Sequence, residues 1–306
     1  MTKIFTALFY RLLCVIVLSL LLISCGQRKD ILKNEILVIT DIGTDIDDAE
    51  ALCLAASDST LRIAALACIG ENVDERIDIA KYLLESFESR GVVGSGVAFI
   101  DSVLSNSKRK MDILLIAPMT DIAAAVERNP KLINKIGEVF FQGQVVVNDD
   151  AEILANAEAF NVSEDIHAAN TFFKAAQSIP FTVVGKYAVY PLALSREVFD
   201  NYEASGHPAG IYLKKAAYKS IRNFAYNKSD VFRRVYSIPS DIGIEDALKG
   251  LDKISNPYDA VSVISLTHPE FFNPIKVGQH RIIGNQKGVS NIINLDGCKI
   301  ELENIF

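Results

Sequence analysis

Positive charge is sparse in this sequence. Of its 306 residues, 31 are Lys or Arg and 38 are Asp or Glu, which gives a formal net charge of −7. Recognition of nucleic acid depends on dense Lys and Arg that neutralise phosphates, and the chain has no stripe of this kind. We therefore expect no nucleic-acid partner. Tryptophan is also absent, yet 50% of the residues are hydrophobic, which is ample for a core.

Cysteines are few and poorly spaced for metal or disulfide chemistry. Two of the five, Cys14 and Cys25, belong to an apolar N-terminal segment. The other three, Cys53, Cys68 and Cys298, form no CxxC pair. Because Cys53 and Cys68 lie in apolar helix-like and strand-like surroundings, we expect buried free thiols and neither a zinc site nor a disulfide framework.

The sequence begins with an apolar run that is short for a membrane span. Two basic residues precede this run over residues 12–23, and a serine and Cys25 follow it. This order is typical of a secretory signal. The letters LISC at its end resemble a bacterial lipobox, so residues 1–25 are interpreted as a lipoprotein signal peptide that ends at the lipidated Cys25. An uncleaved anchor helix is the alternative.

Both interpretations place the rest of the chain outside the cytoplasm. We expect a protein of the cell envelope, periplasmic or at the outer membrane, attached to the membrane through the lipid anchor only. Residues 26–34 (GQRKDILKN) are polar and are predicted to be a tether. No repeat or linker divides the remainder, so residues 35–306 are predicted to form one domain.

Strand-like and helix-like segments alternate after the tether. This alternation predicts an α/β fold with an open, mostly parallel central sheet flanked by helices. Residues 195–255 are more polar and are predicted to form a mainly helical insertion. The expected strands cover residues 36–40, 61–69, 113–116, 139–141 and 181–184, and the expected helices cover residues 49–56, 73–87, 120–127 and 166–176.

Four aspartates, Asp41, Asp45, Asp47 and Asp48, lie where the first expected strand meets the following helix, in EILVITDIGTDIDDAEALCL. Open α/β sheets bind ligands beyond the carboxyl ends of their strands. A helix cap, worth about 1 kcal/mol, and turn chemistry explain two of the four. They do not explain Asp41 at the end of a buried run. A hard divalent cation would, because Ca²⁺ takes about six to eight oxygen ligands; the pattern of an EF-hand is absent.

Four segments resemble, in order and at consistent spacing, the signatures of the inosine-uridine nucleoside hydrolases. The first is ITDIGTDIDDAEAL, similar to a longer variant of the family's N-terminal signature. Residues 116–125 resemble its GPLTNLALAL segment, residues 159–169 its AEFNxxxDPEAA segment, and residues 257–262 its H-D-P-x-A segment. The resemblance implies the Rossmann-like fold of that family over residues 35–270.

The resemblance also implies a calcium site. Its ligands would be the side chains of Asp41, Asp48 and Asp259 and the backbone carbonyl of Thr120. Asp41 would act in addition as the general base on water. Such a site suits cleavage of an N-glycosidic bond, because the transition state is oxocarbenium-like and the attacking water needs a nearby carboxylate.

The sequence departs from the family pattern in its substrate contacts. Ile39 replaces a supporting acid, and Ala159 replaces a glutamate, with Glu158 one position earlier. Tyr258 replaces a histidine that protonates the leaving base in some members, and tyrosine is a poor acid near neutrality because its ordinary pKa is about 10. The candidate substrate-binding residues are Asp47, Asn72, Glu158, Phe160, Asn161 and Tyr258.

Several of these residues have simpler alternatives. Asn72 is also placed to cap a helix, and Phe160 is equally compatible with a core position. The four histidines lie in surface-like contexts and are expected to be exposed, and Lys186 is expected to be solvated.

The resemblance implies calcium-dependent hydrolysis of the N-glycosidic bond of a ribonucleoside or related riboside by a metal-bound water. The alternative is a lipoprotein of the same fold that binds a nucleoside or sugar with weak or no turnover. A phosphatase-like reaction on Asp41 is disfavoured, because Ile39 stands where DxDGT requires its first aspartate. Family members are commonly oligomeric, so a homo-oligomer is expected.

Overall fold

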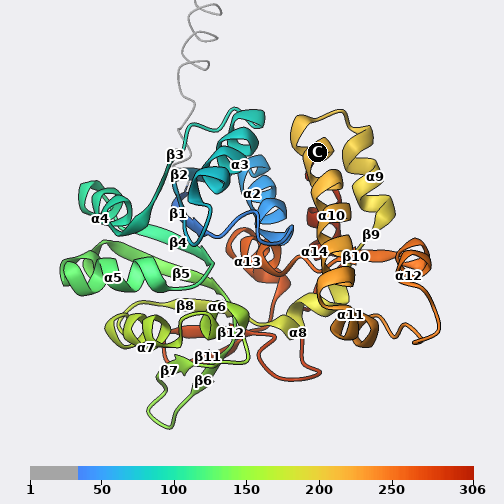
Figure 1. Ribbon diagram of the computed structural model, residues 1–306. Helices are drawn as coiled ribbons and strands as arrows, with labels where there is room; N and C mark the ends of the chain where they lie inside the picture. The colour runs from blue at the N-terminus through green and yellow to red at the C-terminus, as the bar shows by residue number, and fades with distance from the viewer. Residues whose placement is uncertain (1–33) are drawn as a thin grey trace, which may run out of the picture. The chain divides into compact units, whose positions relative to one another are not determined.

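An eight-stranded sheet forms the centre of the structure, a computed structural model that describes residues 34–306 (Figure 1). All neighbouring strands pair in parallel except at one edge, where the last two form an antiparallel pair. In spatial order the strands are β11 (Ile275–Val277), β12 (His280–Ile283), β8 (Phe181–Val184), β5 (Ile136–Gln142), β4 (Met111–Ile116), β1 (Asn34–Thr40), β2 (Leu61–Cys68) and β3 (Val92–Ser95).

The five expected strands are confirmed as β1, β2, β4, β5 and β8. Strand β1 shows why these strands could be predicted from the sequence. Its residues Ile36 to Ile39 are all 0% exposed. Ile36 and Val38 belong to one hydrophobic core, and Leu37 and Ile39 belong to a second core on the opposite face. A parallel strand buried on both faces reads as a continuous apolar run. The predicted signal peptide, Cys25 and most of the tether lie outside the described residues.

Helices cover both faces of the sheet, as predicted. The helices of one face are α2 (Asp47–Ser57), α3 (Val73–Ser86), α13 (Tyr258–Thr267) and α14 (Leu295–Glu303), and those of the other are α4 (Gly96–Asn106), α5 (Thr120–Arg128) and α7 (Ile166–Ala175). Within residues 34–306, none of the helices combines the length and hydrophobicity that crossing a bilayer requires.

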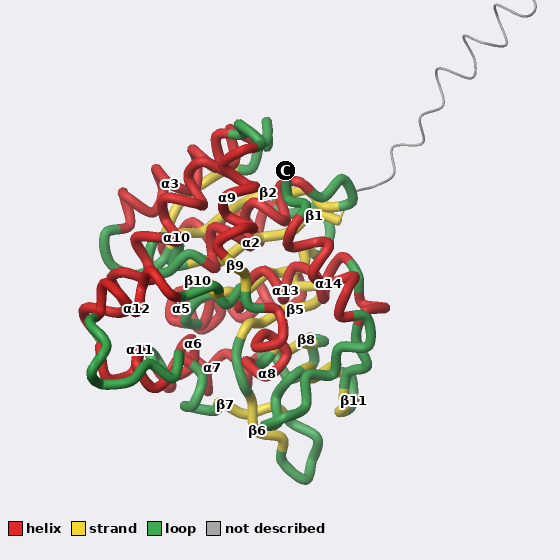
Figure 2. Tube along the Cα trace, turned by 90° about the vertical axis from the view of Figure 1, so that its right-hand side faces the viewer, coloured by secondary structure: helices red, strands yellow, loops and turns green. Residues whose placement is uncertain are grey.

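The predicted helical insertion is confirmed and packs beside α2 and α3. Figure 2 views the molecule from the side of this insertion. A short antiparallel pair joins its two ends, with Ser255 opposite Leu194. The elements are β9 (Leu194–Ser195), α9 (Arg196–Ala204), α10 (Pro208–Asn227), α11 (Ser229–Val235), α12 (Ile244–Gly250) and β10 (Lys253–Ser255).

Short elements complete the fold. They are the β6 (Val145–Val147) and β7 (Ile153–Ala155) hairpin, α6 (Phe160–Ser163), α8 (Lys186–Val189) and the 3₁₀ turns Pro130–Lys135, Tyr190–Leu192 and Pro269–Phe271.

Two side-chain expectations were tested by burial. Cys53 and Cys68 are buried free thiols, as predicted, and so is Cys298. The expectation of exposed histidines holds for His167 but not for His207 and His268, which are half-buried. It is wrong for His280, which is 3% exposed. Its ring nitrogen Nδ1 accepts a hydrogen bond from the Phe181 N–H at 3.3 Å, because β12 lies inside the sheet and not at its edge.

Candidate active site

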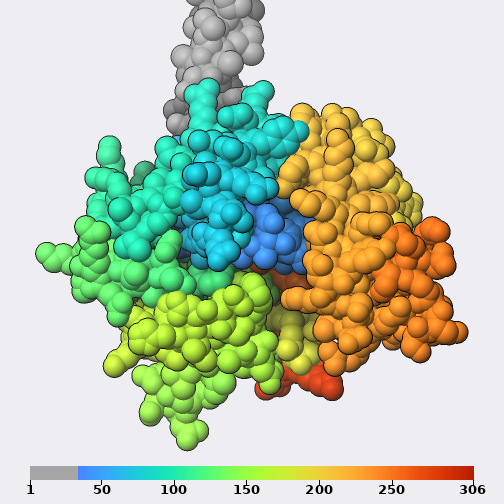
Figure 3. Space-filling view, in the orientation of Figure 1, coloured from blue at the N-terminus to red at the C-terminus, as the bar shows by residue number. Residues whose placement is uncertain are grey.

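A cavity of about 500 Å³ lies at the carboxyl ends of the central strands. We call it the strand-end cavity. Asp41 follows β1, Ile116 and Gln142 end β4 and β5, and Lys186 follows β8, and all four line it. Helix α10 forms the facing wall, and Figure 3 shows the hollow between this helix and the strand ends. The position is the one at which open α/β sheets bind ligands.

The turn between β1 and α2 carries the four aspartates. Gly43 has a φ of +96°, a left-handed conformation that glycine adopts without strain. The Thr44 hydroxyl donates to the Asp41 backbone carbonyl at 3.0 Å and to Asp41 Oδ2 at 3.2 Å. Arg76 Nη1 donates to the Ile42 carbonyl at 2.8 Å and to Thr44 Oγ1 at 2.9 Å. These bonds fix the turn, so the carboxylates enter the cavity from a defined backbone.

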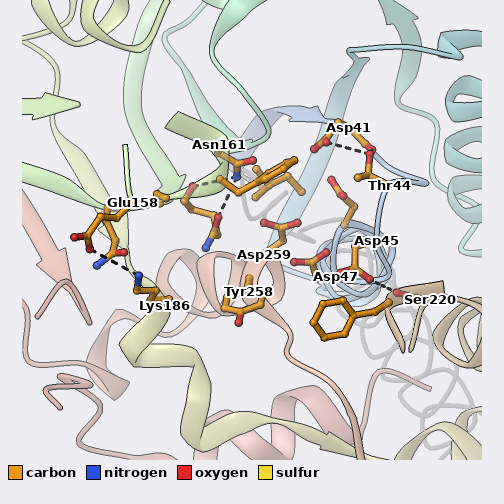
Figure 4. A pocket seen from close by; sticks show the side chains of 18 of the residues that line it. Asp41, Thr44, Asp45, Asp47, Glu158, Asn161, Lys186, Ser220, Tyr258 and Asp259 are labelled. Atoms are coloured by element: carbon orange, nitrogen blue, oxygen red, sulfur yellow. Dashed lines mark hydrogen bonds and ion pairs between the residues drawn. The ribbon is translucent and has the colours of Figure 1, made fainter. Parts of the chain in front are cut away.

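Asp47, Asp48 and Asp259 converge in this cavity. Each offers a carboxylate oxygen, and these oxygens lie within 4.8 Å of one another. Asp48 is 3% exposed and Asp259 is 4% exposed. Asp47 and Asp48 begin α2, and Asp259 lies in the first turn of α13. We call these three side chains the aspartate trio; Figure 4 shows Asp47 and Asp259 facing each other.

The aspartate trio carries negative charge that little in the described residues offsets. The Thr40 hydroxyl donates to Asp48 Oδ1, but no Lys or Arg within residues 34–306 forms an ion pair with the trio. Burial, and then repulsion from neighbouring carboxylates, raises the pKa of Asp47, Asp48 and Asp259 well above the ordinary value. The helix N-termini supply only partial positive charge.

The donor set fits a hard divalent cation. Ca²⁺ and Mg²⁺ both prefer carboxylate oxygens, and a dication removes the repulsion that the trio suffers without one. The structure therefore brings together two of the predicted metal-binding carboxylates, Asp48 and Asp259, and adds Asp47 to them.

Asp41 and Thr120, the other predicted ligands, lie outside the trio. Asp41 is half-buried and lines the strand-end cavity, and burial raises the pKa of its carboxyl although Arg76 opposes this shift. In Figure 4 its carboxylate lies beside Thr44. The hydroxyl of Thr120 donates to Asp165 Oδ2 at 2.9 Å. Thr120 lines a neighbouring cavity of about 670 Å³ that shares Asp41, Thr44 and Phe160 with the first. Their roles as ligands stay predictions.

Four of the predicted substrate-binding residues besides Asp47 line the strand-end cavity. Asn161 is 5% exposed, and its Nδ2 donates to the Gln142 side-chain Oε1 at 3.0 Å. Phe160 is 54% exposed and is therefore not a core residue. Glu158 is exposed, and Tyr258 is half-buried. Burial, followed by a neighbouring tyrosine, raises the pKa of Tyr258 above its ordinary value, which makes it a still weaker acid.

The structure does not bring Asn72 into this cavity. Asn72 is exposed, has a φ of +53° and precedes α3 without a side-chain capping bond. It lines neither of the two cavities described above.

One face of α10 was not found from the sequence. Ser220, Asn223, Phe224 and Asn227 recur at helical spacing and line the strand-end cavity. The Ser220 hydroxyl donates to Asp45 Oδ1 and so connects the insertion to the aspartate turn. The spacing alone could have revealed the face, but not what it contacts. Lys186, expected to be solvated, also lines the cavity.

Comparison with known proteins identifies the family. Residues 82–292, more than half of the chain, match the model of the inosine-uridine preferring nucleoside hydrolases. The chain belongs to this family. The predicted family is thus confirmed, and it makes the chain an enzyme of the N-glycosyl hydrolase type. Curated proteins gave no match.

Solved structures of low sequence identity share the fold. The type III effector protein XopQ complexed with adenosine diphosphate ribose has a TM-score of 0.70 and 20% identity, over 90% of this chain and 93% of that one. The plant nucleoside hydrolase PpNRh1 has a TM-score of 0.60 and 17% identity, over 89% and 99%. A purine-preferring ribonucleoside hydrolase from Gardnerella vaginalis has a TM-score of 0.61 and 14% identity, over 89% and 99%.

Proposed function

We propose that the protein hydrolyses the N-glycosidic bond of a ribonucleoside or related riboside with the help of a bound divalent cation, Ca²⁺ in the first instance. The single observation that carries this proposal is the aspartate trio: three carboxylates, two of them buried, converge at the strand ends, with no basic side chain paired to them in the described residues. In a nucleoside hydrolase such a group suits a cation that contacts ribose hydroxyls.

Asp48 and Asp259 are proposed to hold the cation, with Asp41, Thr120 or Asp47 completing its ligands. When bound, the cation would lower the pKa of a nearby water and orient the vicinal hydroxyls of the ribose. Asp47 is proposed to accept a hydrogen bond from one of these hydroxyls.

Asp41 is the proposed general base. Its half-buried carboxyl lines the cavity, and a pKa raised by burial makes it a better proton acceptor near neutrality. It would take a proton from water as the water oxygen attacks the anomeric carbon and the carbon–nitrogen bond breaks. The remaining carboxylates would stabilise the positive charge that develops on the sugar.

The leaving group is expected to receive little help from Tyr258. Because its pKa is raised, Tyr258 is a weak proton donor at neutral pH. Ribosides whose leaving group departs without protonation, such as p-nitrophenyl riboside, are therefore the expected best substrates. The α10 face, with Phe224 between two asparagines, is suited to contact a planar base.

A second candidate is ligand binding with weak or no turnover. Ala159 replaces the family glutamate, and Tyr258 replaces the histidine. One protein of similar fold is an effector complexed with adenosine diphosphate ribose. The site could serve such a riboside as a receptor.

The test is release of free base, or of p-nitrophenol, by the full-length protein with CaCl₂ and with a chelator. We expect turnover that the chelator abolishes and that Asp41→Asn lowers. Tight binding across a broad riboside panel without any turnover would favour the second candidate.

Attachment to the cell envelope through Cys25 forms part of the proposal. Metabolic labelling with a radioactive fatty acid should mark the wild-type protein and leave Cys25→Ala unlabelled. Equal labelling of both would contradict the anchor.

A further inference from the structure

The strand-end cavity carries side chains of opposite charge on different sides. The aspartates lie on one side, and Lys186 lies with Glu158 on another, away from Asp45 and Ser220 (Figure 4). A ligand that touches both sides meets a strongly acidic region and, at its far end, an ammonium group.

The Lys186 ammonium is only loosely paired. Its Nζ lies 3.9 Å from Glu158 Oε2, beyond hydrogen-bonding distance. The Glu158 side chain is 70% exposed whereas that of Lys186 is 28% exposed. Solvent-exposed ion pairs of this kind contribute little, so a stronger acceptor can replace Glu158 at low cost. Lys186 is the first residue of α8, directly beyond strand β8, and this backbone position fixes where the side chain starts.

The proposed function determines which part of a riboside faces Lys186. The inference about Lys186 therefore rests on the proposed function for the orientation of the ligand. The vicinal hydroxyls face the aspartates, so the substituents on C1′ and C4′ extend away from them. The aromatic and amide face of α10 suits the base on C1′. Asn161, three residues after Glu158 in the chain and lining the same cavity, then faces the C4′ side and its C5′ substituent.

We propose that Lys186 forms a subsite for an anionic group on C5′ of the ribose, so that the preferred ligands are 5′-phosphorylated ribosides. A lysine ammonium paired with a phosphate makes charge-assisted hydrogen bonds, which are stronger than neutral ones. Glu158 opposes this pairing, whereas it would accept a hydrogen bond from an unmodified 5′-hydroxyl. The two residues thus discriminate between the two kinds of ligand.

Calorimetric binding of ribose 5-phosphate and of ribose to the full-length protein tests the proposal independently of turnover. With Ca²⁺ present, the wild type should bind ribose 5-phosphate about tenfold or more tightly than ribose. Lys186→Met should remove this preference. Glu158→Gln should strengthen binding of ribose 5-phosphate and weaken binding of ribose.

Two lysines serve as controls. Lys249 forms an exposed pair with Asp246 at 3.2 Å and does not line the cavity, so Lys249→Met should keep the full preference. Lys228 lines the cavity from the end of α10. A preference that is lost in Lys228→Met and kept in Lys186→Met would overturn the proposal.

Other outcomes also overturn it. Equal binding of ribose 5-phosphate and ribose by the wild type would contradict the subsite. A preference for ribose 5-phosphate that survives in Lys186→Met but is lost on chelation would also contradict it, because the phosphate would then bind through the cation. A parallel turnover assay separates the two claims. Hydrolysis of nucleosides without any preference for phosphate leaves the proposed function intact and removes the subsite. A Lys186-dependent preference for ribose 5-phosphate without any hydrolysis supports the subsite and contradicts the proposed function.

Discussion

Carboxylates gather at both ends of the central sheet, but their surroundings differ. At the amino ends, Glu138 accepts a hydrogen bond from the Thr182 hydroxyl at 2.6 Å and pairs with Arg281. Asp112 accepts the Glu138 N–H at 2.9 Å. At the carboxyl ends, one member of the aspartate trio, Asp48, accepts a hydrogen bond from the Thr40 hydroxyl, and the trio has no basic partner in the described chain.

This difference in hydrogen-bond donors distinguishes acids that stabilise the fold from acids that bind a ligand. An acid that is surrounded by donors contributes to folding, and its loss leaves a donor unsatisfied. Acids crowded without donors oppose folding, so they are retained for what they bind. Substitutions at the two ends of the sheet should therefore change stability in opposite directions.

The largest effect is expected from Asp41. Asp41→Asn removes the proposed base but keeps the shape of the side chain, so kcat/KM for p-nitrophenyl riboside should fall about 10²- to 10⁴-fold with little change in unfolding. Glu138→Gln is the control, and it should hydrolyse the substrate at the wild-type rate. A fully active Asp41→Asn variant would rule out this base.

Asp259→Asn should stabilise the protein in the absence of metal. The substitution removes one buried charge from the trio, so we expect the free energy of unfolding in a chelator to rise by about 2 kcal/mol. Denaturant unfolding measures it. Destabilisation under these conditions would show that Asp259 has a donor that compensates its burial.

Glu50 offers a comparison based on pH. It lies three residues after Asp47 on α2, is 0% exposed, and neither of its carboxylate oxygens has a hydrogen-bond partner within residues 34–306. Burial raises the pKa of Glu50 to about 8, from an ordinary value of 4.5. Between these values the folded protein binds a proton that the unfolded chain releases, so the free energy of unfolding falls as pH rises.

Glu50→Gln removes this dependence. The variant should come close to the wild type near pH 5 and exceed its free energy of unfolding by about 2 kcal/mol more near pH 6.5. Glu85→Gln, at an exposed position on α3, is the matched control and should show the same difference at both values. A Glu50→Gln difference that does not grow with pH would contradict the raised pKa.

Arg281→Met should have the smallest effect, in the opposite direction to Asp259→Asn. The variant leaves Glu138 with the Thr182 hydroxyl but without its basic partner, and both side chains keep some contact with solvent. We expect a loss of about 1 kcal/mol in the free energy of unfolding and unchanged hydrolysis. An unchanged free energy of unfolding would show that this pair is not structural.

Much of the fold could be predicted because its central strands are buried on both faces. Strand β1 is a continuous apolar run for this reason, and β8 has the same character. The outer strands on the two sides of the sheet gave no such signal. Strand β3 is only four residues long and contains Gly94, and β12 begins with His280 and Arg281. Their place in the sheet depends on partners far along the chain.

The site could be predicted only where its residues belong to a motif. Asp48 and Asp259 lie far apart in sequence, and the family resemblance brought them together before the structure did. Asp47 joins them because α2 begins at this residue. Lys186 enters the cavity because it follows β8. The α10 face enters through the packing of the insertion against the strand ends, and no local pattern contains that information.

Calorimetric titration of Ca²⁺ into metal-free protein tests the central claim most directly. We predict saturable binding that is lost in Asp259→Asn and that weakens as the pH falls, because protons compete with the cation for the carboxylates. Equal binding by wild type and Asp259→Asn, or no binding by either, would contradict the account.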